Sequence, residues 1–224
     1  GYAVYDFFLP GLLIDALERG NADTLAGWAQ EILDKHILTV NMLGCHDGIP
    51  MLDLKGLLPE ERIQSLIDLI VSRGGMVKNL HGQKNVYYQV NATYYSALGE
   101  NDAKLLMARV IQMFMPGKPQ VWYLDLFAGK NDYDAVARAG EGGHKEINRT
   151  NLTRTQIEEA LEKPIVTKQL ELLRMRCNCP AFAPGADVSI ESRGHVLTIE
   201  WKHDGHTACL QADLQKLTYH IDTV

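Results

Sequence analysis

The order of short apolar runs and amphipathic segments is the feature that most constrains the fold of this chain. Over residues 1–180, runs typical of buried strands alternate with segments whose apolar residues recur at helical spacing. Strands connected through helices pair in parallel, so the alternation predicts a parallel α/β sheet. The expected strands cover 2–10, 37–44 and 120–129, and the expected helices cover 11–36, 59–75, 102–119 and 153–177, the last one bent near Pro164.

The pattern changes after Pro180. Residues 186–222 alternate apolar and polar side chains with a period of two, and turn signals stand at Arg193-Gly194 and Asp204-Gly205. This pattern predicts a small antiparallel sheet. We therefore expect two domains, one over 1–180 and one over 181–224.

Composition and charge argue against several classes of partner. The formal net charge is −6 and the sequence has no run of basic residues, which disfavours binding to nucleic acid or to an anionic membrane. No apolar stretch approaches the roughly 18–20 residues of a membrane span, and the first residues carry no basic segment of a secretory signal. Four cysteines in a chain of 224 residues predict reduced thiols and a cytoplasmic protein.

Cys45, His46 and Asp47 follow the 37–44 strand directly, at the position where parallel α/β units carry their chemistry. A nucleophilic thiol is disfavoured, since neighbouring residues of an extended segment point to opposite faces. A metal site is disfavoured as well, because nothing in the sequence gathers the scattered histidines at 81, 144 and 203. A sugar site fits better, because a carboxylate and an imidazole can bind vicinal ring hydroxyls as an oxocarbenium ion develops.

The segment around these residues resembles the strand-seven motif of the α-amylase superfamily, which ends in His-Asp. It is most similar to the sucrose phosphorylase branch, where Cys/Thr-His-Asp-Gly-Ile is typical. Further segments resemble that branch in family order: VYDFFLP, YYQVNATYYSALG, MPGKPQVWYLDLFAGKND and EINRTNLT. The resemblance implies strands six to eight of a (β/α)8 barrel followed by a small antiparallel β domain. Because three strand–helix units cannot close a barrel, we expect this chain to be the C-terminal portion of a longer enzyme.

The resemblance implies roles for five residues. Asp47 matches the carboxylate that binds glucosyl hydroxyls and stabilises the transition state, and His46 matches the imidazole that bonds the same ring. Arg149 matches an arginine that contacts the bound glucosyl unit. Tyr88 and Gln89 match a loop that moves between arrangements favouring fructose and phosphate. The family's nucleophilic aspartate and its acid/base glutamate precede the matched region, so we expect both upstream of this chain.

The acceptor loop departs from the sucrose pattern, which reads Asp-Leu-Tyr-Gln where this chain has Val86-Tyr87-Tyr88-Gln89. Members acting on sucrose 6-phosphate tend to carry a histidine at the position of Tyr88, so that substrate is not favoured either. The 139–149 segment adds His144 and Lys145, two candidate cations for a phosphate group.

The resemblance implies a retaining α-glucoside phosphorylase that makes α-glucose 1-phosphate from sucrose or a related α-glucoside and inorganic phosphate. It implies no metal and no organic cofactor. The expected partners are these small substrates, the upstream part of the same polypeptide, and a second copy in a homodimer. The alternatives are a phosphorylase acting on sucrose 6-phosphate or glucosylglycerol, a transglycosidase or hydrolase of the same fold, and a non-catalytic fragment if the chain stands alone.

Overall fold

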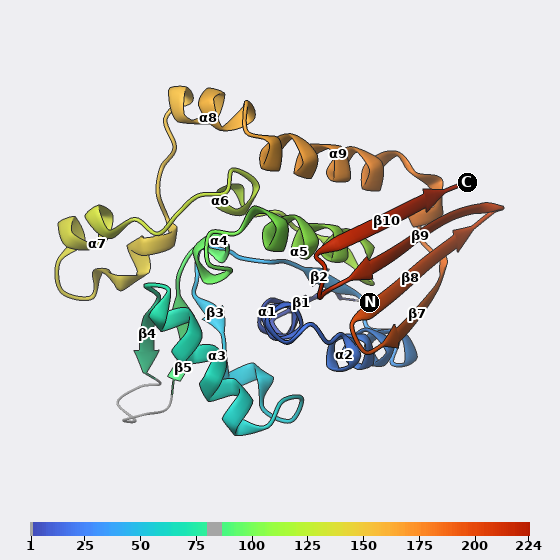
Figure 1. Ribbon diagram of the computed structural model, residues 1–224, viewed down its shortest axis with the longest axis horizontal. Helices are drawn as coiled ribbons and strands as arrows, with labels where there is room; N and C mark the ends of the chain where they lie inside the picture. The colour runs from blue at the N-terminus through green and yellow to red at the C-terminus, as the bar shows by residue number, and fades with distance from the viewer. Residues whose placement is uncertain (1, 80–86) are drawn as a thin grey trace.

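The computed structural model describes residues 2–79 and 87–224. An α/β part is followed by a four-stranded sheet at the C-terminal end (Figure 1). The strands of the described residues are β1 (Val4–Asp6), β2 (Thr39–Asn41), β3 (Ile49–Pro50), β4 (Met76–Asn79), β5 (Tyr87–Asn91), β6 (Lys118–Pro119), β7 (Asp187–Arg193), β8 (Val196–His203), β9 (His206–Asp213) and β10 (Thr218–Thr223). The α-helices are α1 (Leu9–Arg19), α2 (Asp23–Asp34), α3 (Glu60–Ser72), α4 (Tyr94–Ala97), α5 (Asp102–Phe114), α6 (Tyr123–Leu126), α7 (Tyr133–Ala139), α8 (Arg154–Leu161) and α9 (Pro164–Asn178). Three short 3-10 helices complete the list: η1 (Leu52–Leu54), η2 (Gly143–Asn148) and η3 (Pro180–Phe182).

The first sheet contains β1, β2 and β6 in that order, and both pairings are parallel. The predicted parallel arrangement is therefore confirmed. The strand expected over 120–129 is wrong: the third strand is β6, just before that run, and part of the run folds into α6. A short apolar run has the same composition in a buried strand and in a buried helical turn, so periodicity cannot separate the two.

The expected helices form, but two of them are divided. The 11–36 segment becomes α1 and α2, separated at Gly20, whose φ of 60° lies in the left-handed region that favours glycine. The 153–177 segment becomes α8 and α9, and the second helix begins at Pro164. Proline suits the first turn of a helix because its missing N–H would have no intrahelical partner there. Among the described residues, no helix has both the length and the apolar character needed to cross a bilayer.

A second sheet, with the order β3-β5-β4, was not anticipated from the sequence. Both of its pairings are antiparallel. The strand β3 comes directly after the segment that carries His46 and Asp47, and β5 carries Tyr88 and Gln89. This small sheet therefore connects the two parts of the predicted sugar site.

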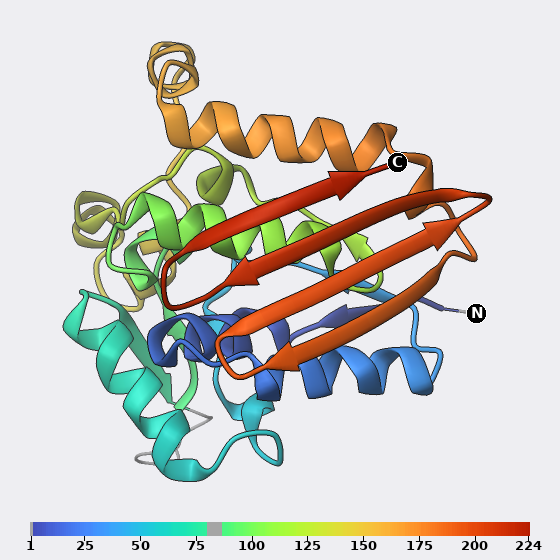
Figure 2. The same ribbon diagram turned by 45° about the vertical axis from the view of Figure 1, so that its right-hand side comes forward.

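The C-terminal sheet is antiparallel with the order β10-β9-β8-β7, and its turns fall at both predicted positions. It lies across α1, α2 and α5 (Figure 2). The side chains of its inner face are buried in the same hydrophobic core as those helices: Leu197, Ile199, Trp201, Ala208, Leu210 and Ala212. The predicted boundary at residue 180 remains a prediction.

Two side chains fix the sheet to the α/β part. The indole Nε1 of Trp201 donates to the carbonyl of Phe114, the last residue of α5, at 2.7 Å. The guanidinium of Arg176 stacks over the rings of Phe182 and Trp201, with its Cζ atom 4.0 Å and 4.4 Å from their centroids. Cation–π stacking of this kind, together with a satisfied carbonyl, stabilises the junction of α5, α9 and the C-terminal sheet.

The strand β1 lies at one edge of the parallel sheet, and apolar side chains around it are exposed. Tyr5 is 53% exposed, Val4 51% and Phe7 44%. An edge strand with exposed apolar residues offers free backbone groups and apolar surface to another chain.

We expect the isolated 224-residue chain to self-associate and to lack a cooperative monomeric unfolding transition, because this edge is uncovered. Val4→Lys should reduce the association, since a charge on an edge strand opposes pairing. Val71→Lys, at an exposed site on α3, is the control. Light scattering after size exclusion and urea unfolding provide the measurements. A monodisperse wild-type monomer with one cooperative transition would contradict the prediction.

Candidate functional site

The segment 44–48 bends at the C-terminal end of β2, where the sequence predicts the site. The bend is held by a buried carboxylate, because the backbone N–H of Gly44 donates to Asp125 Oδ2 at 2.8 Å. A Cβ atom on Gly44 would lie 2.9 Å from both oxygens of that carboxylate, so this close approach requires glycine. Asp125 lies in α6. The run 120–129, which was expected to form a strand, therefore contributes a hydrogen-bond acceptor to the bend.

Two neighbouring side chains bind three consecutive backbone carbonyls of the bend. The amide Nδ2 of Asn148 donates to the carbonyls of Cys45 and Asp47, at 2.8 Å and 2.9 Å. The Nε of Arg149 donates to the carbonyl of His46 between them, at 2.8 Å. We call these three bonds the carbonyl clamp. Because the partners are more than 100 positions apart in the chain, the clamp fixes the bend against the C-terminal end of η2, formed by Asn148 and Arg149.

The three residues with the most specific predicted roles meet at this point. His46 Nε2 lies 3.4 Å from Asp47 Oδ2, and Arg149 Nη2 lies 3.6 Å from the other carboxylate oxygen, Oδ1. The side chains of His46 and Asp47 are 64% and 51% exposed, and that of Arg149 is 30% exposed. The imidazole and the carboxylate therefore remain accessible to a ligand while their backbone is fixed. Their roles in binding a glucosyl unit remain a prediction.

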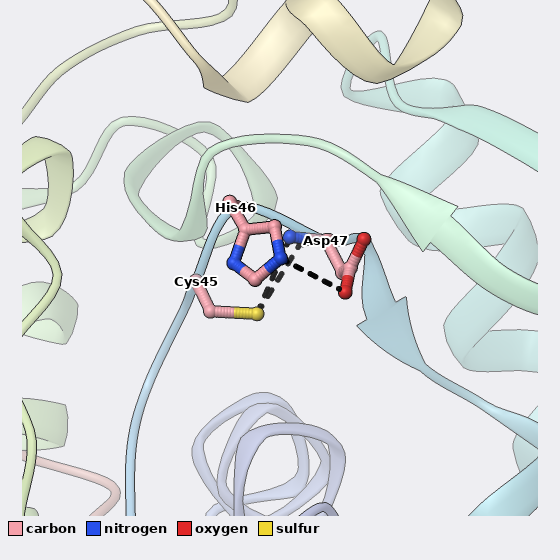
Figure 3. A group of neighbouring side chains, drawn as sticks. All are labelled: Cys45, His46 and Asp47. Atoms are coloured by element: carbon pink, nitrogen blue, oxygen red, sulfur yellow. Dashed lines mark hydrogen bonds and ion pairs between the residues drawn. The ribbon is translucent and has the colours of Figure 1, made fainter.

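Cys45 does not point away from its neighbours as the sequence argument expects. The backbone is bent rather than extended here, so the thiol, the imidazole and the carboxylate gather at the bend (Figure 3). One ligand atom from each residue lies within 4.8 Å of the other two. Burial raises the pKa of the Cys45 thiol, which keeps it protonated at neutral pH. A protonated thiol is a poor nucleophile, so burial disfavours thiol catalysis, whereas the geometric reason given from the sequence is wrong.

A pocket brings Asp47 together with the predicted acceptor residues Tyr88 and Gln89. Phe7, Met42 and Ile49 contribute apolar walls to the same pocket. Tyr88 is 39% exposed, whereas Gln89 is buried and donates to the Oδ1 atom of Asn91 at 3.5 Å. The structure thus gathers Asp47, Tyr88 and Gln89 around one space. Val86, where the sequence departs from the sucrose pattern, and His81 lie outside the described residues.

His144 and Lys145 lie in η2, a few residues before Arg149. Within the described ranges, neither side chain lines the pocket around Asp47. Glu146 of the same helix pairs with Arg149 across 3.5 Å. The two candidate cations are therefore connected to the site through this short helix, and their contact with a phosphate group remains a prediction.

Asn148 and Asp125 are site residues that sequence reasoning missed. Asn148 has 2% of its surface exposed and Asp125 has 1%. Burial raises the pKa of the Asp125 carboxyl to about 6, while the charge of Arg109 and the backbone N–H groups of Gly44 and Tyr94 act to lower it. The available signals were a single acidic residue inside the apolar run 120–129 and an asparagine next to the predicted arginine.

Two curated relatives match nearly the whole chain. It is 53% identical over 222 residues to a sucrose 6(F)-phosphate phosphorylase from Ilumatobacter coccineus, and the match covers 95% of the chain and 42% of that protein. It is 34% identical over 227 residues to a sucrose phosphorylase from Streptococcus mutans, with 98% of the chain and 46% of that protein covered. The chain therefore spans less than half the length of these relatives.

Solved structures agree with these matches. Sucrose 6F-phosphate phosphorylase from Thermoanaerobacter thermosaccharolyticum matches with a TM-score of 0.92 at 36% identity, covering 100% of this chain and 45% of that one. An α-amylase from H. orenii matches with a TM-score of 0.59 at 13% identity, covering 95% of this chain and 39% of that one, which shows the fold alone. No protein-family model matches the chain.

Asp125→Asn should remove one pH-dependent contribution to stability in the whole protein. The pKa is raised from 3.8 to about 6 by burial, so the folded state retains a proton that the unfolded chain has lost between these values. The resulting contribution is complete below the lower value and is lost as the pH rises through the upper one. We expect the melting temperature of the wild type to fall, relative to the Asn variant, mainly as the pH rises from 3.8 to about 6.

Calorimetry across this range measures the difference, with the exposed Asp187→Asn as the control for a lost surface carboxylate. A constant difference between wild type and Asp125→Asn at every pH would show that Asp125 does not titrate there.

Proposed function

The chain belongs to the sucrose phosphorylase family of the α-amylase superfamily, and on that premise we propose that the protein transfers a glucosyl unit from an α-glucoside to inorganic phosphate. The observation that carries the proposal is the meeting of His46, Asp47 and Arg149 at the end of β2, beside a pocket lined by Asp47 and Tyr88. In this proposal the chain supplies part of the site, and the nucleophile and the acid/base come from an upstream part of the same polypeptide.

Asp47 is the residue that we assign to transition-state stabilisation. Positive charge develops at the anomeric carbon and ring oxygen as the glycosidic bond breaks, and a fixed carboxylate stabilises that charge. His46 binds ring hydroxyls beside Asp47. Arg149 orients the carboxylate through its contact with Oδ1, which leaves Oδ2 and the imidazole directed at the sugar.

The proposed reaction is a retaining double displacement. An upstream aspartate attacks the anomeric carbon while an upstream glutamic acid protonates the departing alcohol oxygen, giving a covalent glucosyl ester. Phosphate then attacks the same carbon, and the aspartate leaves with its electron pair. The products are α-glucose 1-phosphate and the free alcohol.

The finer architecture follows the same proposal. We assign β1, β2 and β6 to strands six, seven and eight of a (β/α)8 barrel, since they pair in parallel in this order. The C-terminal ends of barrel strands meet at one face, where an upstream nucleophile and acid/base would join Asp47. The exposed apolar side chains at β1 then become the surface against which strand five packs.

Sucrose phosphorylated on its fructosyl 6-hydroxyl is the substrate that we favour. A relative with this specificity in its name, from Ilumatobacter coccineus, is 53% identical to the chain, whereas the sucrose phosphorylase from Streptococcus mutans is 34% identical. This reverses the order of the sequence-based expectation, which favoured sucrose and took Tyr88 as evidence against the phosphorylated form. In this proposal Tyr88 stacks on or donates to the alcohol, and the cations His144 and Lys145 serve phosphate groups.

Asp47→Asn in the whole protein should lower kcat by roughly 10² or more, with a smaller effect on KM, because the neutral amide cannot stabilise the developing positive charge. Steady-state phosphorolysis measures both constants. Asp204→Asn, the same exchange in the turn between β8 and β9, is the control, since asparagine tolerates the positive φ of 47° there. Near wild-type turnover in Asp47→Asn would rule out the assigned role.

An acceptor panel tests the substrate. With α-glucose 1-phosphate as donor, we expect fructose 6-phosphate to accept the glucosyl unit with a higher kcat/KM than fructose or glycerol. Lys145→Ala should raise KM for fructose 6-phosphate more than KM for fructose, because only the former presents a dianion. Lys202→Ala, on the C-terminal sheet, is the control.

Three outcomes would contradict parts of this proposal. Preference for fructose would return the assignment to sucrose, and equal effects of Lys145→Ala on both acceptors would remove Lys145 from phosphate recognition. Release of glucose that needs no phosphate would indicate a hydrolase.

A further inference from the structure

The bend at 45–47 gathers three different metal-binding groups: a thiol, an imidazole and a carboxylate. Each offers one ligand atom, and these atoms all lie within 4.8 Å of one another (Figure 3). The proposed reaction uses the imidazole and the carboxylate but has no task for the thiol of Cys45. Sugar binding therefore accounts for His46 and Asp47 but not for the position of the Cys45 thiol beside them.

The spacing of the trio suits a small tetrahedral ion. In a tetrahedral zinc site with bonds of about 2.0–2.1 Å to nitrogen and oxygen, two ligand atoms lie about 3.3 Å apart. His46 Nε2 and Asp47 Oδ2 are 3.4 Å apart, so one ion can contact both without movement of the backbone. The sulfur of Cys45 lies within 4.8 Å of one ligand atom of His46 and one of Asp47.

The backbone around the trio is fixed before any ion arrives. The carbonyl clamp binds the carbonyls of all three residues, and Cys45 Sγ accepts the backbone N–H of Asp47 at 3.3 Å. Ligands held on a fixed backbone lose less conformational entropy when they bind, which favours association.

The charges around the trio select the kind of ion. A sulfur ligand favours thiophilic ions such as Zn²⁺ over Mg²⁺ or Ca²⁺, which prefer oxygen. The guanidinium of Arg149 lies 3.6 Å from Asp47 Oδ1 and opposes any cation, so the site suits an ion that gains strongly from thiolate coordination. Three protein ligands leave the fourth position of a tetrahedral ion open to water.

We propose that Cys45, His46 and Asp47 form an inhibitory binding site for Zn²⁺ and similar thiophilic cations. Coordination releases the thiol proton to solvent and leaves the oxidation state of the ion unchanged. The ion occupies Nε2 of His46 and Oδ2 of Asp47, the atoms assigned to the glucosyl hydroxyls, so it competes with the sugar. The competition rests on the proposed function, whereas the metal site itself does not.

Co²⁺ provides a test that needs no enzymatic activity. Added to the whole protein in a buffer without phosphate, Co²⁺ bound by a thiolate gives a sulfur-to-metal charge-transfer band in the near ultraviolet. We expect this band to appear, to be displaced by Zn²⁺, and to be absent in Cys45→Ser. Cys177→Ser, which removes an exposed thiol in α9, should retain the band and serves as the control. Circular dichroism of each variant establishes that it is folded.

Inhibition is measured in the synthetic direction, because inorganic phosphate itself binds Zn²⁺. We expect Zn²⁺ to raise KM for α-glucose 1-phosphate, with a chelator restoring the original value. The inhibition constant should be weaker in Cys45→Ser by roughly tenfold or more, each variant being compared with its own metal-free rate.

The outcomes separate this proposal from the proposed function. A band that persists in folded Cys45→Ser, or no band in an active wild type, overturns the metal site and leaves the phosphorylase proposal intact. A band that depends on Cys45 in a protein without phosphorolysis supports the metal site and overturns the phosphorylase proposal. Inhibition that leaves KM unchanged overturns competition with the sugar.

Discussion

Three hydrogen bonds from Asn148 and Arg149 to consecutive carbonyls fix the geometry of the site. A bend of irregular backbone has carbonyls without partners in a strand or helix, and it would otherwise sample several conformations. The clamp satisfies three of these carbonyls at once and also fixes the direction of the side chains between them. The guanidinium that bonds the carbonyl of His46 also lies near the carboxylate of Asp47, so one residue holds both the backbone and the charge.

The bend is supported from below by a buried polar network. Arg109, without exposed surface, donates through Nε to Gln169 and through Nη1 to Gln112. Gln112 in turn donates to the carbonyls of Asn41, at the end of β2, and of Gln120. Buried polar groups are stable in a core only when most of their hydrogen bonds are made. The bonds from Gln112 therefore tie the ends of β2 and β6 to α5.

Exposed side chains on a backbone that buried residues hold in place are typical of a binding site. His46 and Asp47 present more than half of their side-chain surface to solvent, while Asn148 and Asp125 beneath them are almost fully buried. Exposed groups on a mobile loop would have to be ordered by each ligand at an entropic cost. Here the hydrogen bonds of the fold order these groups in advance, which lowers the entropic cost of binding for the proposed sugar and for the proposed cation. Preorganisation alone does not distinguish one ligand from another. Selection between ligands therefore depends on the shape and charge of the residues around the site.

The sequence by itself determined the parallel order of β1 and β2, most of the helices, and the antiparallel C-terminal sheet with both of its turns. These features depend on local spacing of apolar residues and on turn residues, which are visible within a window of one element. The pairing of His46 and Asp47 at a strand end followed from the same local order, and the family resemblance added Arg149.

Only the tertiary structure decided the rest. The run 120–129 has the composition of a strand, but Asp125 within it lies in the helical turn α6. Its carboxylate accepts the N–H of Gly44, a partner 81 positions away. The convergence of Cys45 with its neighbours depends on a bend that Asn148 holds from more than 100 residues away. Contacts over such separations follow from how the elements pack, because no local pattern records which distant amide will meet which carbonyl.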